Sequence, residues 1–284
     1  MACRIVATSP DCRMLILQGF RQTYDNVWDI KNPRLHNISS LTLSDSSARV
    51  LETLAPHLAN LATLKTNLDL DCTHFNVYRW NFLQLRELDY TVPSNGHYQA
   101  LRSLYLFMLN HCRTVLESFS IEFASLATLQ EERTPSQVYI LISDTISKAT
   151  ALSMPANLWD RCPDLEKCFR KHLVTSPLTR LSLVAGGSWP SENFFAWDKP
   201  KLVELDVASR DPRADVMRDI ALLRAHAPSL KSLTVHCVEG EGIKFTPIEL
   251  SSFLQGVDTG GIRCVCVPVR RSKVHGWENK QNVE

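Results

Sequence analysis

The chain has 284 residues, of which 44% are hydrophobic, and this excludes a globally disordered protein because a sizeable core can be buried. The 31 Lys and Arg residues nearly balance the 30 Asp and Glu residues, so a net charge of +1 gives no field that attracts nucleic acid or an acidic membrane. No apolar run approaches the roughly 20 residues that span a bilayer, and no signal peptide is visible. We therefore expect a cytoplasmic or nuclear protein whose nine cysteines are reduced thiols.

A six-residue pattern recurs along the chain: an apolar residue, two variable residues, an apolar residue, one variable residue and a further apolar residue. The mean spacing of about 28 residues is typical of repeats that combine one strand with one helix. Each copy predicts one short strand. The ten copies begin at Cys12, Ile38, Lys65, Leu85, Leu116, Ala149, Leu178, Leu202, Leu230 and Ile262.

Alternation within each copy predicts which side chains are buried. The fourth and sixth positions are apolar in all ten copies, so we expect them to point into the core. The fifth position is polar in eight copies, and its residues are Ile16, Thr42, Asp69, Asp89, Ser120, Ser153, Ser182, Asp206, Thr234 and Cys266. A polar outer face argues against the doubly covered parallel sheet of many α/β enzymes, whose strands are continuously apolar.

The segments between the copies predict helices. The segments 47–60, 98–112 and 158–173 have helical character, and Thr134 and Thr246 each begin a capping box with proline at the first helical position. "DPRA" predicts a further helix that is capped by Asp211 and ended by Pro228. The apolar face of this helix consists of Val216, Ile220, Leu223 and Ala227.

The copies "LRELDY", "LTRLSL", "LVELDV" and "LKSLTV" resemble leucine-rich repeats. Irregular, helix-containing arrays of this kind resemble those of fungal F-box proteins, and Cys72 and Cys237 resemble the cysteine-containing repeat subtype. The resemblance implies an α/β, irregular leucine-rich-repeat solenoid with a parallel concave sheet and helices on the convex side. We expect a truncated or atypical lead-in over residues 1–11, about ten repeats over 12–269, and a polar disordered tail over 270–284.

The F-box itself is not visible before Cys12, where the first copy begins. Three alternatives stay open: a fragment, an array without the adaptor-binding segment, or a kinship of architecture alone. The abrupt start without a polar capping repeat favours a fragment. We expect a ubiquitin-ligase adaptor as a partner only if an F-box exists upstream.

Several Cys and His residues lie close together in the sequence and are candidates for chemical sites. His236 and Cys237 fall on opposite strand faces, as a surface histidine and a buried thiol, and Cys162, Cys168 and His172 do not supply four ligands for structural zinc. Cys264 and Cys266 share a face that we expect the tail to cover in part. The aromatic segment 186–200 is expected to pack against the convex side, with an exposed partner anchor as the alternative. We predict no catalytic residue, metal or cofactor.

Carboxylates gather at outward positions of several copies. They are Asp69, Asp71, Glu87, Asp89 and Glu122, with a smaller group at Glu204 and Asp206. One interpretation is a solvated sheet face; the other is a partner-binding surface that prefers a basic segment, since solenoids bind on such faces.

These patterns predict non-catalytic protein–protein recognition rather than an enzyme. The specific hypothesis, from the resemblance, is the substrate-recognition part of an F-box-type ubiquitin-ligase receptor. The alternative is a free-standing scaffold or inhibitor with no ubiquitin link, and a Cys/His enzyme is the remote third.

Overall fold

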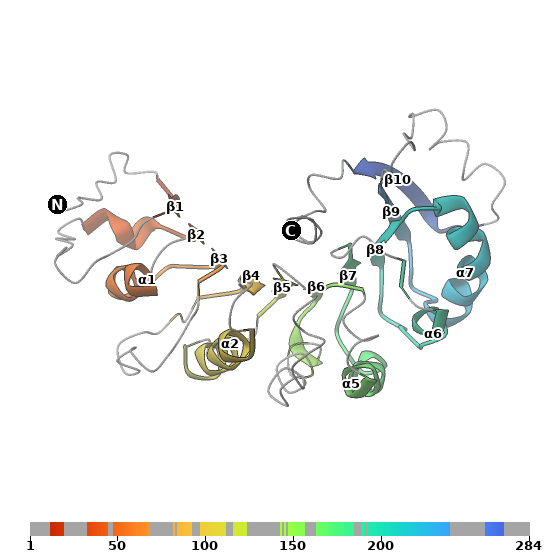
Figure 1. Cartoon of the computed structure of the whole chain (residues 1–284), viewed down its shortest axis with the longest axis horizontal. Coiled ribbons are helices and arrows are strands. Elements are labelled where there is room, and N and C mark those ends of the chain that lie inside the picture. The colour runs from red at the N-terminus through yellow and green to blue at the C-terminus, as the bar shows by residue number, and fades with distance from the viewer. Residues whose placement is uncertain are drawn as a thin grey trace, which may run out of the picture. The chain divides into compact units, whose positions relative to one another are not determined.

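The computed structural model describes residues 12–19, 33–44, 48–68, 82, 84–92, 97–111, 116–123, 143, 145, 147–156, 163–184, 189–190, 192–238 and 259–269. The chain divides into two compact units, one made of Met1–Phe123 with Thr134–Leu141 and the other of Ala124–Arg133 with Ile142–Glu284. In each unit the strands are parallel and follow chain order, and the described helices lie on one side of them (Figure 1). The protein is therefore α/β, which confirms the class that the repeated pattern predicts.

In the described part of the first unit, five parallel strands form the sheet. They are β1 (Met14–Gln18), β2 (Ser40–Ser44), β3 (Thr63–Thr66), β4 (Glu87–Val92) and β5 (Ser118–Phe123). Its helices are η1 (Pro33–Asn37), α1 (Ala48–Leu54), η2 (Ala55–His57) and α2 (His97–His111). The register aligns Leu15, Leu41, Leu64, Leu88 and Phe119 in one row across the sheet. From Leu41 onward this row is buried, so it forms the centre of the core.

Five parallel strands also lie among the residues described for the second unit. They are β6 (Ala151–Ser153), β7 (Arg180–Leu183), β8 (Glu204–Ser209), β9 (Ser232–Val238) and β10 (Arg263–Val269). Its helices are α5 (Pro163–Leu173), α6 (Glu192–Phe195) and α7 (Pro212–His226). The corresponding row is Leu152, Leu181, Leu205, Leu233 and Cys264. Its four leucines are buried, which confirms the inward fourth position in β6 to β9.

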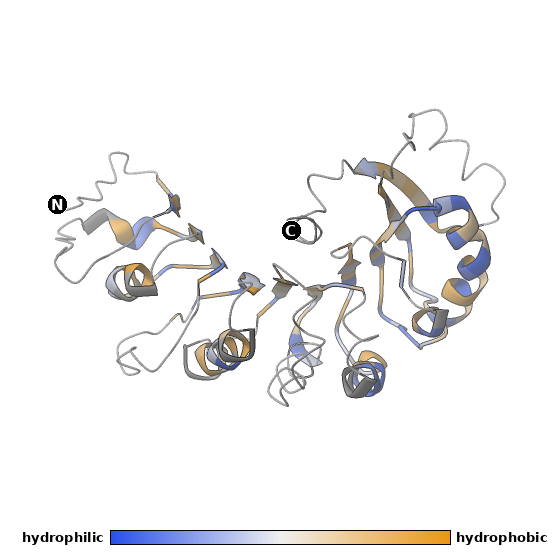
Figure 2. Cartoon of the chain, in the orientation of Figure 1, coloured by the Kyte–Doolittle hydropathy of each residue, from blue (hydrophilic) through white to orange (hydrophobic). Residues whose placement is uncertain are grey.

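Helix α7 forms as its sequence predicts. The Asp211 side chain accepts a hydrogen bond from the Ala214 N–H at 3.2 Å and so caps the first turn. Val216, Ile220 and Leu223 are buried, while hydrophilic residues alternate with them around the helix (Figure 2). The helix therefore closes the core of the second unit on the side opposite the open sheet face.

The other expected helices are found in part. The segment 47–60 contains α1 and η2, and 158–173 contains α5, while α2 begins one residue before the expected segment 98–112. The capping boxes at Thr134 and Thr246 lie outside the described residues, as do the lead-in 1–11 and the tail 270–284.

The sequence-based register of the third strand is wrong. The pattern that begins at Lys65 places Leu68 at the fourth position, whereas in the structure Leu64 pairs with Leu88 and Thr66 pairs with the next inward residue of β4. Thr66 is buried, and its hydroxyl oxygen accepts a hydrogen bond from the Leu68 N–H at 3.1 Å. A threonine can occupy a core position when its hydroxyl group is hydrogen-bonded. A pattern that requires an apolar residue at this position therefore places the strand in the wrong register.

The sequence-based register of the last strand is also wrong, by one residue. Cys264 and Cys266 pair with the inward Leu233 and Val235, so Val265 occupies the outward position that the pattern assigned to a cysteine. A shift by one residue exchanges the two faces of a strand. The run "IRCVCV" is apolar at nearly every position, and therefore its sequence does not distinguish the faces.

No described helix combines the length and the apolar character that a membrane span requires.

Candidate partner-binding surface on the first unit

A hollow of about 310 Å³ lies on the sheet of the first unit. Its lining comes from β2 to β5 and consists of Ser40, Thr42, Thr63, Lys65, Glu87, Leu88, Asp89, Ser118 and Ser120. All of these except Leu88 stand at outward strand positions, opposite the buried row. We call these outward residues, together with Glu122 of β5, the polar face. Leu88 is not part of it.

Lys65 and Asp89 form an ion pair within the polar face. The sheet register places the two residues opposite each other on β3 and β4, and Nζ lies 2.6 Å from Oδ2. The hydrogen bond to Asp89 raises the pKa of Lys65, so the amine is charged at neutral pH. The Lys65 side chain is 60% exposed and the Asp89 side chain 31%, so the ammonium group lies at the solvent edge of the pair.

The two other carboxylates have different surroundings. Glu87 Oε2 accepts a hydrogen bond from the Thr63 hydroxyl at 3.1 Å, again across β3 and β4. The pKa of Glu122 is raised, first by partial loss of solvent and then by the charge of Asp89. The polar face therefore holds three carboxyl groups and one ammonium group.

The structure groups some of the predicted site residues and separates others. Glu87, Asp89 and Glu122 share the polar face of the first unit, whereas Glu204 and Asp206 lie on β8 of the second unit. Glu204 is partly neutralised, since its Oε2 lies 3.8 Å from Arg180 Nε on β7. The smaller group that the sequence pattern set apart, Glu204 and Asp206, therefore belongs to the second unit. Asp69 and Asp71 lie outside the described residues.

Sequence reasoning missed Lys65 as a member of the surface. The corrected register of β3 turns its side chain outward, next to carboxylates that the sequence analysis treated as uncompensated. The signal was present in "LATLKT" at 61–66, which has the spacing of the other copies once threonine is accepted at the sixth position. The hydroxyl side chains that line the hollow were also overlooked because they carry no charge.

The other Cys and His candidates of the sequence lie in the second unit. His236 is half-buried on the outward face of β9, where burial lowers its pKa against the opposing effect of Asp206, while Cys237 is fully buried on the inward face. His172 lies in α5, and the Cys162 and Cys168 side chains lie outside the described residues. Within the described ranges no three His, Cys, Asp or Glu side chains are placed to hold a metal ion.

The aromatic segment packs inward, as expected. Phe194, Phe195 and Trp197 are buried, with the Phe194 and Trp197 rings edge to face at 5.5 Å. Trp189 stacks on Phe195 at 5.2 Å and donates from Nε1 to Asp219 Oδ2 at 2.7 Å. These aromatic rings are therefore part of the hydrophobic core of the second unit.

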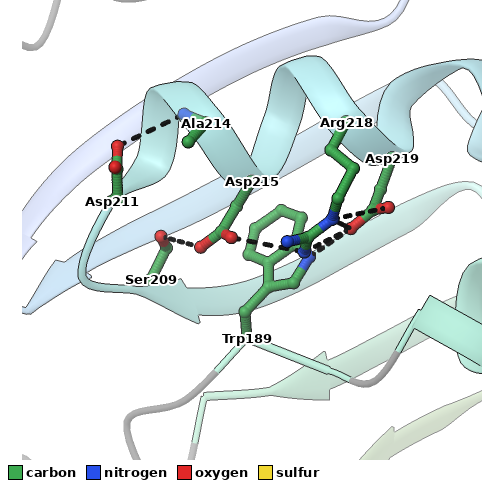
Figure 3. Close-up of polar contacts among 7 residues, drawn as sticks. All are labelled: Trp189, Ser209, Asp211, Ala214, Asp215, Arg218 and Asp219. Carbon is green, nitrogen blue, oxygen red and sulfur yellow. Dashed lines mark hydrogen bonds and ion pairs between the residues drawn. The ribbon is translucent and has the colours of Figure 1, made fainter.

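A polar network anchors α7 beside Trp189 (Figure 3). Asp219 is fully buried and also accepts a hydrogen bond from Arg218 at 2.9 Å, and Asp215 accepts one from the Ser209 hydroxyl at 2.6 Å. Both carboxylates thus have a donor, which the fully buried Asp219 requires because an unpaired buried charge is costly. The network joins β8, α7 and the aromatic segment.

Comparison with known proteins gives no family assignment. A scan against protein-family models finds no match, and a search of curated proteins finds no significant relative.

Proposed function

We propose that this chain is a non-catalytic recognition protein, organised as a leucine-rich-repeat array, whose polar face binds a protein partner through a basic segment. The observation that carries the proposal is the hollow over β2 to β5, which combines hydroxyl groups with the carboxylates of Glu87 and Asp89 and the single ammonium group of Lys65. Hydroxyl and carboxylate groups on an open sheet accept hydrogen bonds from lysine and arginine side chains in many geometries.

The ion pair supports a mechanism of recognition. An incoming ammonium or guanidinium group competes with Lys65 for Asp89, and the flexible, exposed Lys65 side chain can turn away at small energetic cost. Glu87 lies beside this pair and offers a second carboxylate. The partner's charge then steers association and contributes specificity.

The more specific version is the substrate-recognition part of an F-box-type ubiquitin-ligase receptor, and it rests on the sequence resemblance alone. In that version the partner is a ligase substrate with a basic segment. In the alternative version the chain is a free-standing scaffold or inhibitor, and the same surface binds its target.

Peptide arrays test the surface directly. The purified chain is probed with matched extended peptides that are rich in Lys and Arg, rich in Asp and Glu, or neutral, and titrated against the best binders at two salt concentrations. We expect basic peptides to bind, more weakly at high salt. The Glu87→Gln, Asp89→Asn double variant should weaken this binding about tenfold or more, since tenfold corresponds to about 1.4 kcal/mol.

Glu117→Gln is the matched control, because Glu117 is an exposed carboxylate of the same unit that pairs with Arg86 and does not line the hollow. Equal weakening by the control and the double variant, or a preference for acidic peptides, contradicts the proposed surface.

A further inference from the structure

Three cysteines share one face of the last two strands. The register pairs Cys264 with Leu233, Cys266 with Val235 and Pro268 with Cys237. Since side chains alternate along a strand, Cys237 points to the same inward face as Val235, and both β10 cysteines point there too. The one-residue correction of the β10 register thus brings together thiols that the sequence pattern placed on opposite sides.

Two of these thiols touch. The Cys237 and Cys266 side chains are hydrogen-bonded to each other, and Cys237 Sγ also lies 3.6 Å from the Val235 carbonyl oxygen. Cys237 is fully buried, whereas Cys266 is only partly buried. A small solute can therefore reach the Cys266 thiol, whereas the Cys237 thiol lies behind it.

The two thiols differ in acidity. The hydrogen bond from Cys237 lowers the pKa of Cys266, while the same bond and burial raise the pKa of Cys237. Burial raises the pKa of Cys264 to about 11. Because the thiolate is the nucleophile, we expect peroxide to react first at Cys266.

We propose that Cys266 and Cys237 form a peroxide-reactive dithiol that closes to an intrachain disulfide between β10 and β9. The Cys266 thiolate attacks one oxygen of hydrogen peroxide, breaks the O–O bond and becomes a sulfenic acid with release of hydroxide. The Cys237 sulfur then attacks the Cys266 sulfur, the S–O bond breaks, and hydroxide leaves with the Cys237 proton as water. In total, two thiols and one peroxide give one disulfide and two waters.

Closure requires a small movement of β10. The two cysteines are offset by two residues on adjacent strands, which in a flat sheet places their Cα atoms about 8 Å apart. Disulfides span roughly 4.4–6.8 Å between Cα atoms, so β10 must slide toward Cys237. β10 stands at the end of the sheet order and pairs with β9 alone among the described strands, so a shift of β10 disturbs one ladder of hydrogen bonds.

Peptide mapping of the oxidised protein tests the proposal. The reduced full chain is treated with limiting hydrogen peroxide, remaining thiols are alkylated, and the unreduced protein is digested with trypsin. The expected product is residues 232–244 linked to residues 264–270. The Cys264→Ser variant assigns the link, since it leaves Cys266 as the one cysteine in the second peptide.

Two further variants separate the steps. Cys237→Ser should accumulate a sulfenic acid at Cys266 that dimedone traps, and Cys266→Ser should abolish the linked peptide pair. Cys12→Ser in the first unit is the control and should leave the link unchanged. Loss of the link in Cys264→Ser, or oxidation of Cys266 beyond the sulfenic acid without a link to Cys237, overturns the proposal. The peptide map of the oxidised wild-type protein tests the disulfide even if a variant does not fold.

Discussion

Lys65 on β3 and Asp89 on β4 stand directly opposite each other on the open side of the sheet, with Nζ 2.6 Å from Oδ2. This pair controls how much negative charge the polar face offers. It also depends on the register of β3, because a shift by one residue would turn Lys65 into the core.

The first prediction concerns this ion pair. Replacing Lys65 with methionine should change the free energy of unfolding by less than about 1 kcal/mol, because exposed pairs contribute little. The same change removes a positive charge from the polar face, so binding of basic peptides should become several-fold tighter. Urea unfolding and peptide titration measure the two effects. The control is Lys201→Met, since Lys201 is an exposed lysine of the second unit, and it should change neither stability nor peptide binding. A large loss of stability in Lys65→Met would contradict this account.

The second prediction concerns Tyr90, which is fully buried in β4 and donates its hydroxyl proton to the Leu68 carbonyl oxygen at 2.9 Å. Tyr90→Phe keeps the ring but leaves that buried carbonyl without this donor, so the free energy of unfolding should fall by about 1–3 kcal/mol. Denaturant unfolding gives the value. Thr91→Val, on the open face next to it, should change stability by no more than about 0.5 kcal/mol.

The third prediction concerns Trp189 and Asp219. Trp189→Phe removes the Nε1 donor from a fully buried carboxylate, and we expect a loss of about 1–3 kcal/mol in the free energy of unfolding. A double-mutant cycle with Asp219→Ala isolates the interaction, and the coupling should be about 0.5–3 kcal/mol. Additive losses would mean that stacking on Phe195 accounts for the effect of Trp189.

The fourth prediction concerns Lys199, which is 1% exposed and donates from Nζ to the carbonyl oxygens of Phe194 and Phe195 at 2.8 and 3.3 Å. Burial lowers the pKa of Lys199 to about 7, from 10.5 in the unfolded chain. Between these two values the unfolded state holds a proton that the folded state has lost. Stability from this group should therefore rise with pH above about 7, by on the order of 1 kcal/mol per unit, and level off near 10.5.

Unfolding measurements between pH 6 and 9.5 check this dependence. Lys199→Met should lack the rise, and it should lose stability as well, because the backbone carbonyls keep no donor from this side chain. The exposed control Lys201→Met should retain the rise. An equal slope in wild type and Lys199→Met would assign the pH dependence to other groups.

Several elements could be predicted because their signals are local. The cap at Asp211, the proline after it and the spacing of Val216, Ile220 and Leu223 all describe one helix, and the structure contains it as α7. The strands with leucine or another apolar residue at both inward positions were placed in the correct register for the same reason. Glu87 and Asp89 were placed on the outward face because they alternate with Leu88 and Tyr90.

The partner of each outward side chain depended on the neighbouring strand. Lys65 belongs to the polar face because β3 pairs with β4 through Leu64 and Thr66, and a threonine in the core is acceptable only when another residue satisfies its hydroxyl. Likewise, Cys237 meets Cys266 because of the pairing between β9 and β10.

The sequence by itself determined the α/β class, most strand positions and the polar character of the open sheet face, since these follow from periods of two and about 28 residues. Only the tertiary structure decided the registers of β3 and β10, the ion pair of Lys65 with Asp89 and the contact of Cys237 with Cys266. The physical reason is that an alternating pattern specifies the two faces of a strand, whereas hydrogen bonding between strands specifies which residues stand side by side.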